Sequence, residues 1–120
     1  MKKNPGIFVL ADDLSGAAEI GGIAFNAGLS VRIFTGISDL MDYPDDVVVV
    51  DSNSRNLDPA DAYERIRELV SSINLNDYDL VYKKVDSVLR GPVVAEMDAF
   101  LDSSGKKSVI LIPANPSMGR

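Results

Sequence analysis

The sequence contains no cysteine and no histidine. Without cysteine the chain has no disulfide bond, no thiolate nucleophile and no cysteine-based zinc site. Without histidine it lacks the usual base at neutral pH and the commonest metal ligand in proteins. Any proton transfer on this chain must therefore use carboxylates, lysines or water.

Long apolar runs are also missing. The run IFVLA near the start ends at Asp12 and Asp13, before a signal-peptide core could form. No other run approaches the ~18 apolar residues that would span a bilayer. We therefore expect a cytoplasmic protein that does not interact with a membrane.

Positive charge is in short supply. The chain has 12 Lys and Arg against 18 Asp and Glu, a formal net charge of -6. Such a surface repels a phosphate backbone, so nucleic acid is not an expected partner. With 120 residues the chain fits one small domain with one core.

Short β-branched runs alternate with longer stretches of helical period. This order predicts an α/β fold of the three-layer, Rossmann/flavodoxin-like type, with helices on both faces of a parallel five-stranded sheet. The run VVVV shows no alternation of apolar and polar residues, which is typical of a central strand covered on both faces. The predicted strands are Ile7 to Ala11, Val31 to Phe34, Val47 to Asp51, Leu80 to Lys84 and Val109 to Pro113.

Three helices are predicted between these strands. The first runs from about Ser15 to Ala27, and Gly28 follows it in a position that suits a left-handed residue. The second is capped by Asp58 and starts at Pro59. The third begins at Gly91 and Pro92 and ends near Gly105. Their expected buried residues are Ala17, Ile20, Ala24 and Ala27; Ala62, Ile66, Leu69, Val70 and Ile73; and Val93, Met97, Phe100 and Leu101.

The last predicted strand is followed by only seven residues, which include Pro116 and Gly119. A parallel sheet normally continues through a crossover helix at this point. We therefore expect residues 1–120 to be one domain of a longer polypeptide.

Polar residues collect after four of the predicted strands. The carboxyl ends of parallel strands meet at one edge of the sheet, where ligands of such folds bind. Five of the chain's cations fall in these loops, which suits a small anion rich in hydroxyls, such as a sugar acid. The clusters are Asp12, Asp13, Ser15 and Gly16; Asp51, Ser52, Asn53, Ser54 and Arg55; Lys83 through Arg90; and Asn115, Ser117, Gly119 and Arg120.

Several of these residues also have a purely structural interpretation. Asp13 or Ser15 can cap the first helix, and Arg55 can form a surface ion pair with Asp58. One of the adjacent lysines, Lys83 and Lys84, is expected to point to solvent or to a surface carboxylate. The agreement of four clusters favours a ligand site more than any single residue does.

Four stretches carry a family resemblance: ADDLSGAAEIG (11–21), DSNSR (51–55), YKKVDSVLRG (82–91) and PANPSMGR (113–120). Together they resemble the amino-terminal domain of the four-carbon acid sugar kinases, formerly a domain of unknown function. The resemblance extends from the first predicted strand to the last residue. The KKVDS and LRG pair is its most specific motif, whereas many α/β proteins carry an acidic loop like ADDL.

The resemblance implies a two-domain kinase that transfers phosphate from ATP to a hydroxyl of threonate, erythronate or a related acid. This chain would bind the sugar acid. A carboxyl-terminal domain would bind ATP and Mg²⁺ mainly outside this chain, so no metal site is assigned here and the chain alone is expected to be inactive. A homo-oligomer is compatible with this interpretation.

The resemblance also implies roles for individual residues. Asp12 and Asp13 would act at the reacting hydroxyl, with either of them as the base, while Arg90 and Lys84 would neutralise the substrate carboxylate. Three residues depart from the family's usual pattern and bear on substrate identity: Ser15 and Val88, each in place of threonine, and Pro92 in place of asparagine. The implied substrate-binding residues are Ser15, Gly16, Ser54, Arg55, Lys84, Asp86, Ser87, Arg90, Asn115, Gly119 and Arg120.

Two other functions share parts of this pattern. A receiver-like signalling module would use the acidic pair, with Asp51 as phosphoacceptor, but that architecture expects a lysine after the fifth strand, where this sequence reads IPANP. A non-catalytic module that binds sugar acids would use the same residues as the kinase domain.

Overall fold

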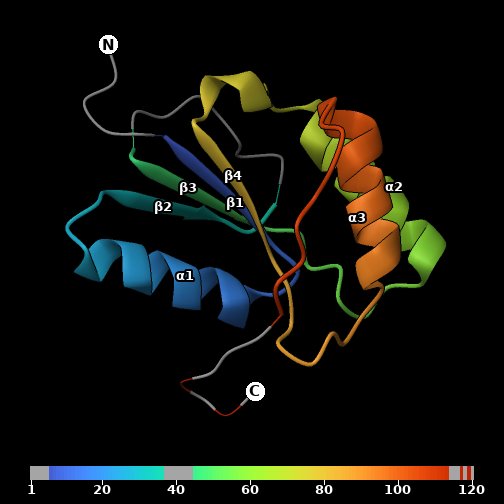
Figure 1. Ribbon diagram of the computed structural model, residues 1–120, viewed down its shortest axis with the longest axis horizontal. Coiled ribbons are helices and arrows are strands. Elements are labelled where there is room, and N and C mark those ends of the chain that lie inside the picture. The colour runs from blue at the N-terminus through green and yellow to red at the C-terminus, as the bar shows by residue number, and fades with distance from the viewer. Residues whose placement is uncertain (1–5, 37–44, 114–116, 118, 120) are drawn as a thin grey trace.

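The sheet has four parallel strands in the order β2-β3-β1-β4 (Figure 1). The computed structural model describes residues 6–36, 45–113, 117 and 119. The α/β class and the first four predicted strands are confirmed. These strands are β1 (Ile7–Ala11), β2 (Val31–Phe34), β3 (Val47–Asp51) and β4 (Leu80–Lys84).

Helices cover both faces of the sheet, as predicted. Helix α1 (Leu14–Asn26) lies on one face, while α2 (Pro59–Ser71) and α3 (Val93–Ser104) lie together on the other (Figure 1). A short 3₁₀ helix, η1 (Leu75–Asp77), precedes β4. No helix in the described part of the chain is both long and apolar enough to cross a membrane.

Two apolar cores lie on opposite faces of the sheet because successive side chains of a strand point to opposite sides. Phe8 and Val48 belong to the core under α2 and α3. Val9 and Val49 belong to the core under α1. All five residues of β3 are buried, which confirms the interpretation of VVVV as a central strand.

The close packing of α1 depends on glycine. A Cβ atom at Gly21 would lie only 2.9 Å from Cδ1 of Ile33, so the absence of a side chain lets the helix approach β2. Gly28 follows the helix with a φ of +89°, the left-handed conformation that the sequence predicted. Ala27, an expected core residue, is exposed because it lies just beyond the end of the helix.

The other two helices differ in detail from the prediction. Asp58 occupies the position before α2 and Pro59 begins the helix, but the Asp58 side chain makes no capping hydrogen bond. In α3 the buried residues are Glu96, Ala99 and Phe100. The expected stripe was wrong at its other three positions, Val93, Met97 and Leu101, which are only half-buried.

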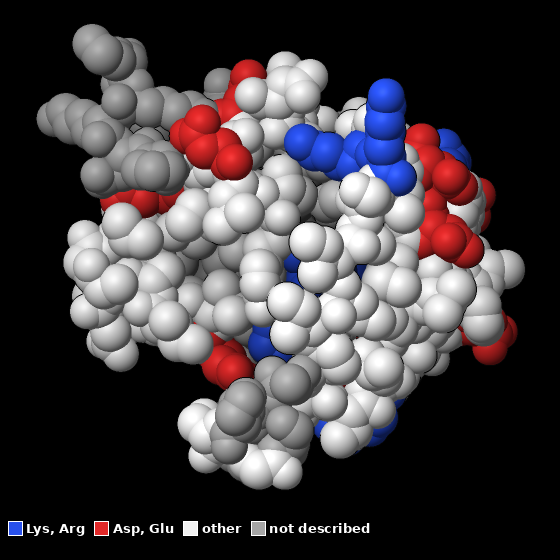
Figure 2. All heavy atoms as spheres, in the orientation of Figure 1, with Lys and Arg blue, Asp and Glu red and all other residues white. Residues whose placement is uncertain are grey.

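The predicted fifth strand was wrong. Residues 105–113 run from the end of α3 back in the direction of β4 without forming a strand (Figure 1). Ile110 and Ile112 are 85% and 74% exposed. Figure 2 shows that the face over which this segment passes is largely uncharged in its middle.

The sheet edge beside this segment is well covered on one face only. A strand that is apolar on both sides needs a layer on each face. Helix α3 lies on one side of this edge, but Leu80 and Tyr82, which point from β4 to the α1 side, are themselves 52% and 44% exposed. The α1 side of β4 is therefore only partly covered in the described part of the chain.

Candidate functional site

Arg55 lies at the centre of a charged cluster at the carboxyl ends of β1, β3 and β4. Its Nε and Nη2 atoms donate to the two carboxylate oxygens of Asp12 at 3.1 and 2.9 Å. Its Nη1 atom lies 3.0 Å from Oδ2 of Asp13 and 3.8 Å from Oδ1 of Asp86. We call Arg55, Asp12, Asp13, Asp86 and Arg90 the Arg55 cluster.

Asp12 is the buried anchor of the cluster. Its backbone oxygen accepts hydrogen bonds from the amides of Ser54 and Arg55 at 3.1 and 3.2 Å, so the loop after β3 folds over the end of β1. The Asp12 side chain is only 3% exposed. The hydrogen bonds from Arg55 to Asp12 are the main cause of a raised pKa of the Arg55 guanidinium.

Asp13 has two roles at once. Its Oδ1 atom accepts the amide of Gly16 at 2.8 Å, so the predicted helix cap is confirmed. Its Oδ2 atom faces Arg55, and the side chain remains 30% exposed. A Cβ atom at Gly16 would lie 2.9 Å from Oδ1 of Asp13 and 3.3 Å from Cγ of Lys84. The glycine therefore leaves room for both Asp13 and Lys84 at the start of α1.

Asp86 organises the loop between β4 and α3. Its carboxylate accepts the backbone amides of Val88 and Arg90 at 3.2 and 3.1 Å. It also accepts Nε and Nη2 of Arg90 at 3.0 and 2.8 Å. The bonds from the Arg90 side chain are the main reason why the pKa of Asp86 lies well below its usual value.

Gly91 explains the LRG motif. Its φ is +90°, and a Cβ atom there would lie 2.9 Å from the backbone oxygen of Arg55. The loop after β4 thus touches the loop after β3 at a point where no side chain fits. This contact holds Asp86 beside Arg55.

The two lysines at the end of β4 point to opposite faces of the sheet. Lys84 lies beside Gly16 on the α1 side, and its Nζ atom donates to the oxygen of Val85 at 2.8 Å. Nζ of Lys83 lies 2.9 Å from Oε1 of Glu96 in α3. Lys83 is therefore not the lysine that faces solvent or a surface carboxylate, because the carboxylate that it meets is buried.

The loop after β3 is tightly bonded. Burial is the main reason why the pKa of Asp51 is raised, and the negative charges of Asp13 and Asp12 add to it. Ser54 is fully buried, and its hydroxyl lies 2.7 Å from that of Ser52. In this conformation Ser54 supports the loop and is not open to a ligand.

The remaining predicted residues lie around or outside the cluster. Ser15 is exposed at the start of α1, and Ser87 is half-buried in the loop after β4. Gly119 is exposed with a φ of +71°. Asn115 and Arg120 lie outside the described residues.

Two residues that sequence reasoning did not assign support the site. Nη1 of Arg65, in α2, donates to the backbone oxygens of Ser52 and Asn53 at 3.3 and 3.0 Å and so holds the loop after β3. Glu96 is the other. It follows Val93 by three positions and precedes Phe100 by four, so its spacing is that of the buried face of the helix. An acidic residue in such a position could have indicated a buried charge.

The cluster offers positive charge to a ligand mainly through Arg90 and Lys84. Arg55 already faces three carboxylates. Arg90 is 67% exposed although it is paired with Asp86, and an ammonium such as that of Lys84 carries three donors. Within residues 6–36, 45–113, 117 and 119, no group of three or more acidic side chains is arranged to hold a metal ion.

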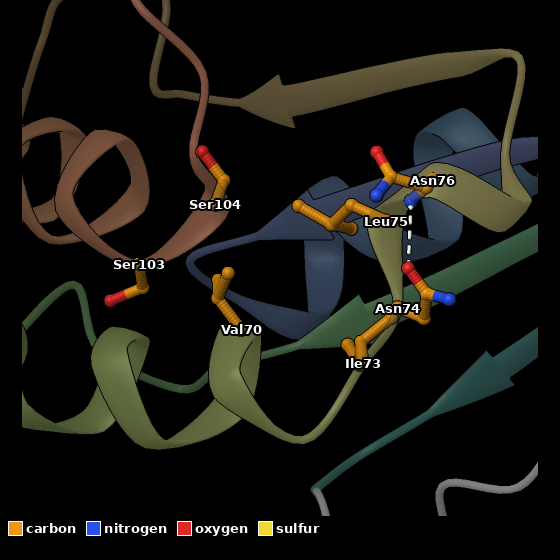
Figure 3. A pocket seen from close by; sticks show the side chains of 7 residues that line it. All are labelled: Val70, Ile73, Asn74, Leu75, Asn76, Ser103 and Ser104. Carbon is orange, nitrogen blue, oxygen red and sulfur yellow. Dashed lines mark hydrogen bonds between the residues drawn. The ribbon is translucent and has the colours of Figure 1, made fainter.

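A separate hollow of about 200 Å³ lies at the opposite edge of the sheet, where β4 begins (Figure 3). Figure 3 shows apolar side chains from the end of α2 and from η1 beside the serines that end α3. None of the residues that line this hollow is charged, so none could bind a carboxylate through an ion pair. The hollow is lined by Val70, Ile73, Asn74, Leu75, Asn76, Ser103 and Ser104.

Comparison with known proteins identifies the family. Residues 7–120 match the family described as the sugar-binding N-terminal domain. The chain belongs to this family. The resemblance to the four-carbon acid sugar kinases is therefore confirmed, and the receiver-like alternative gains no support.

Two relatives of this sugar-binding domain are named as kinases. A D-erythronate kinase of Heliobacterium modesticaldum is 32% identical over 118 residues, which cover 95% of this chain and 27% of the relative. A D-threonate kinase of Bordetella bronchiseptica is 33% identical over 122 residues, which cover 97% of this chain and 30% of the relative. The chain thus spans less than a third of these relatives.

A solved structure shares the fold of this sugar-binding domain. The crystal structure of a domain of unknown function from Bordetella bronchiseptica, with bound citrate and as a domain-swapped dimer, aligns with a TM-score of 0.71 and 33% identity. The alignment covers 82% of this chain and 26% of that chain.

Proposed function

We propose that this chain is the substrate-binding domain of an ATP-dependent kinase that phosphorylates a hydroxyl of a four-carbon sugar acid of the threonate or erythronate type. Family membership and the names of the relatives support this proposal. So does the citrate in the solved relative, because citrate is also a carboxylate anion rich in oxygen. The observation that carries the proposal is the Arg55 cluster, in which Arg90 is exposed.

In this proposal Arg90 and Lys84 bind the substrate carboxylate. The outer edge of the Arg90 guanidinium faces solvent, while Asp86 holds the side chain in place through two bonds. A preorganised fork of this kind suits a carboxylate. Ser15 and Ser87 would then contact the hydroxyls of the substrate from either side of the cluster.

We assign the proton acceptor to Asp13 and the orienting role to Asp12. Both oxygens of Asp12 are bonded to Arg55 and the side chain is buried, whereas Asp13 remains partly exposed. Phosphoryl transfer depends mainly on positioning and charge stabilisation. Asp13 would hold the attacking hydroxyl in line and accept its proton late in the transfer, while Arg55 keeps the two carboxylates apart.

ATP and Mg²⁺ would bind mainly to the remainder of a longer kinase. We therefore assign the chemistry of the nucleotide and its metal ion to that remainder, and only the binding and positioning of the sugar acid to this chain. When bound, ATP supplies the phosphoryl group. The domain-swapped relative also supports a homo-oligomer as a proposal for this protein.

The test is calorimetric titration of the protein that contains this chain with D-threonate and D-erythronate, with the alditols threitol and erythritol as uncharged controls. We expect an acid to bind and the alditols not to bind. Arg90→Ala should weaken acid binding by about tenfold or more, as loss of a charge-assisted contact does. Equal binding of acids and alditols, or of neither, would overturn the proposal.

Turnover separates the two aspartates. Asp13→Asn should lower kcat with little change in KM, because Asp13 acts on the reacting hydroxyl. Asp12→Asn should change stability as well, because it alters the partner of Arg55. If the Asp13→Asn variant kept the wild-type kcat, Asp13 would not be the proton acceptor.

A further inference from the structure

A buried ion pair between β4 and α3 is not used by the proposed mechanism. The side chains of Lys83 and Glu96 are only 9% and 1% exposed, and Nζ lies 2.9 Å from Oε1. The two atoms are in contact but are not aligned as a hydrogen bond, so charge attraction holds the pair. Lys83 is the fourth residue of β4, and Glu96 lies in the first turn of α3.

The pair closes the loop that carries two of the five residues of the Arg55 cluster. Residues 85–92 lie between β4 and α3 and include Asp86 and Arg90. This loop has a positive φ of +59° at Leu89, a costly conformation for a residue with a side chain, which its surroundings must maintain. The Lys83–Glu96 contact fixes the distance between the two elements at its ends.

The start of α3 also determines the contact between Gly91 and Arg55. A Cβ atom at Gly91 would lie within 3.0 Å of Arg55, so the two loops already touch. A shift of α3 away from β4 would draw Gly91 and Arg90 with it. The distance between Arg55 and Asp86, now 3.8 Å, would then increase.

Stabilisation of the fold does not by itself account for a buried ion pair at this position. Buried ion pairs usually stabilise a fold no more than apolar side chains of similar size, because both charges lose their hydration. What an ion pair adds in a low-dielectric interior is a defined separation, since displacement leaves two buried charges unpaired. The core beside it, with Phe8, Leu10 and Phe100, could accommodate an apolar pair.

We propose that Glu96, through Lys83, is a positioning residue for the substrate site. It sets the start of α3 against the end of β4 and thereby holds Asp86 and Arg90 beside Arg55. The ligand consequence rests on the proposed sugar-acid function, but the structural consequence does not. Glu96 itself is buried and does not touch the substrate.

The first test needs no ligand. Hydrogen exchange is measured at the amides of Val88 and Arg90, which donate to Asp86. The double variant Lys83→Met/Glu96→Leu removes both charges and keeps side-chain volume, and Glu96→Gln is the second variant. We expect exchange at these two amides to be faster by about tenfold or more, with a melting temperature of the double variant close to that of the wild type.

Tyr63→Phe is the matched control. It removes the 2.6 Å bond from Tyr63 to Asp102, which ties α2 to α3 away from the loop. Exchange at Val88 and Arg90 should stay at the wild-type rate in this variant. Wild-type exchange in a folded Lys83→Met/Glu96→Leu or Glu96→Gln variant would overturn the proposal.

The second test is the kinase reaction of the protein that contains this chain. In the double variant the KM for the sugar acid should rise by about tenfold while kcat stays within about twofold, because ground-state binding is lost. A wild-type KM together with faster exchange would separate the loop from substrate binding and overturn the positioning role. No turnover by the wild type with any sugar acid would count against the proposed function alone, since the exchange result is read independently.

Discussion

The Arg55 cluster and residues 105–113 are opposite cases of how one chain uses its loops. In the cluster, charged side chains from three separate loops are held by one another, and Asp12 is almost fully buried. In residues 109–112, four large apolar side chains in succession are 40% to 85% exposed. From polarity alone, we would expect the charged side chains to be exposed and the apolar side chains to be buried.

The contrast shows that the groups which contact a side chain decide its burial more than its own polarity does. A buried carboxylate is tolerated where a guanidinium satisfies both of its oxygens. The exposed apolar run lies beside a sheet edge that is well covered on one side only. Three predictions test the Arg55 cluster and its loops, and a fourth tests the apolar segment. They begin with the largest expected effect.

Arg55→Ala should destabilise the fold most. It leaves Asp12 buried without its partner, and breaking a buried pair typically costs about 3–5 kcal/mol. Urea unfolding of wild type and variant measures the loss. Arg67→Ala is the matched control, since Arg67 pairs with Glu64 on the exposed side of α2, and it should leave the midpoint nearly unchanged. Equal midpoints for the two variants would contradict the role of Arg55.

Gly91→Ala should cost more than Gly28→Ala. Both glycines have φ near +90°, and forcing alanine into a left-handed conformation costs about 1–2 kcal/mol in each. Only at Gly91 does the new Cβ meet another loop, for nothing lies within 4 Å of it at Gly28. This overpacking should add about 1–3 kcal/mol in the unfolding free energy. Equal losses would mean that the loops do not touch in solution.

Asp86→Asn should be less stable than the wild type near pH 7, and the difference in stability should shrink as the pH falls. The pKa of Asp86 is lowered by Arg90, so its charge stabilises the folded state above the unfolded pKa of about 3.9. This stabilisation is lost as pH falls from that value through the lower folded pKa. Thermal melting at pH 7, 4 and 3 should show the gap narrowing. A gap that is constant with pH would contradict the Asp86–Arg90 pairing.

Ile110→Asp should have the smallest effect. Its side chain is 85% exposed, so the unfolding free energy should change by no more than about 0.5 kcal/mol. Ile66→Ala, in the core under α2, is the comparison and should cost about 2–5 kcal/mol. A loss at Ile110 as large as that at Ile66 would show that the segment is buried in solution.

Much of the fold was readable from local pattern. The four strands begin and end at the predicted residues, and the helix limits agree within one or two positions. Gly28 has the positive φ expected after the first helix, and the third helix ends beside Gly105 as predicted. These features depend on neighbours in the sequence, through periodicity and the conformational freedom of glycine.

The site was predictable in composition but not in pairing. The motifs placed Asp12, Arg55 and Asp86 at one sheet edge, because carboxyl ends of parallel strands coincide. They did not indicate that Arg55 would face three carboxylates, or that Ser54 would be buried. Those outcomes depend on distances between loops that are remote in the chain.

The sequence by itself determined the four strands of the sheet, the helices and the edge at which the charged residues meet, because each follows from short-range pattern and strand direction. Only the tertiary structure decided that Asp13 and not Asp12 stays accessible, that Lys83 turns to a buried Glu96, and that residues 109–113 remain unpaired. The physical reason is that burial and pairing are set by what covers a side chain, and that cover comes from distant parts of the chain.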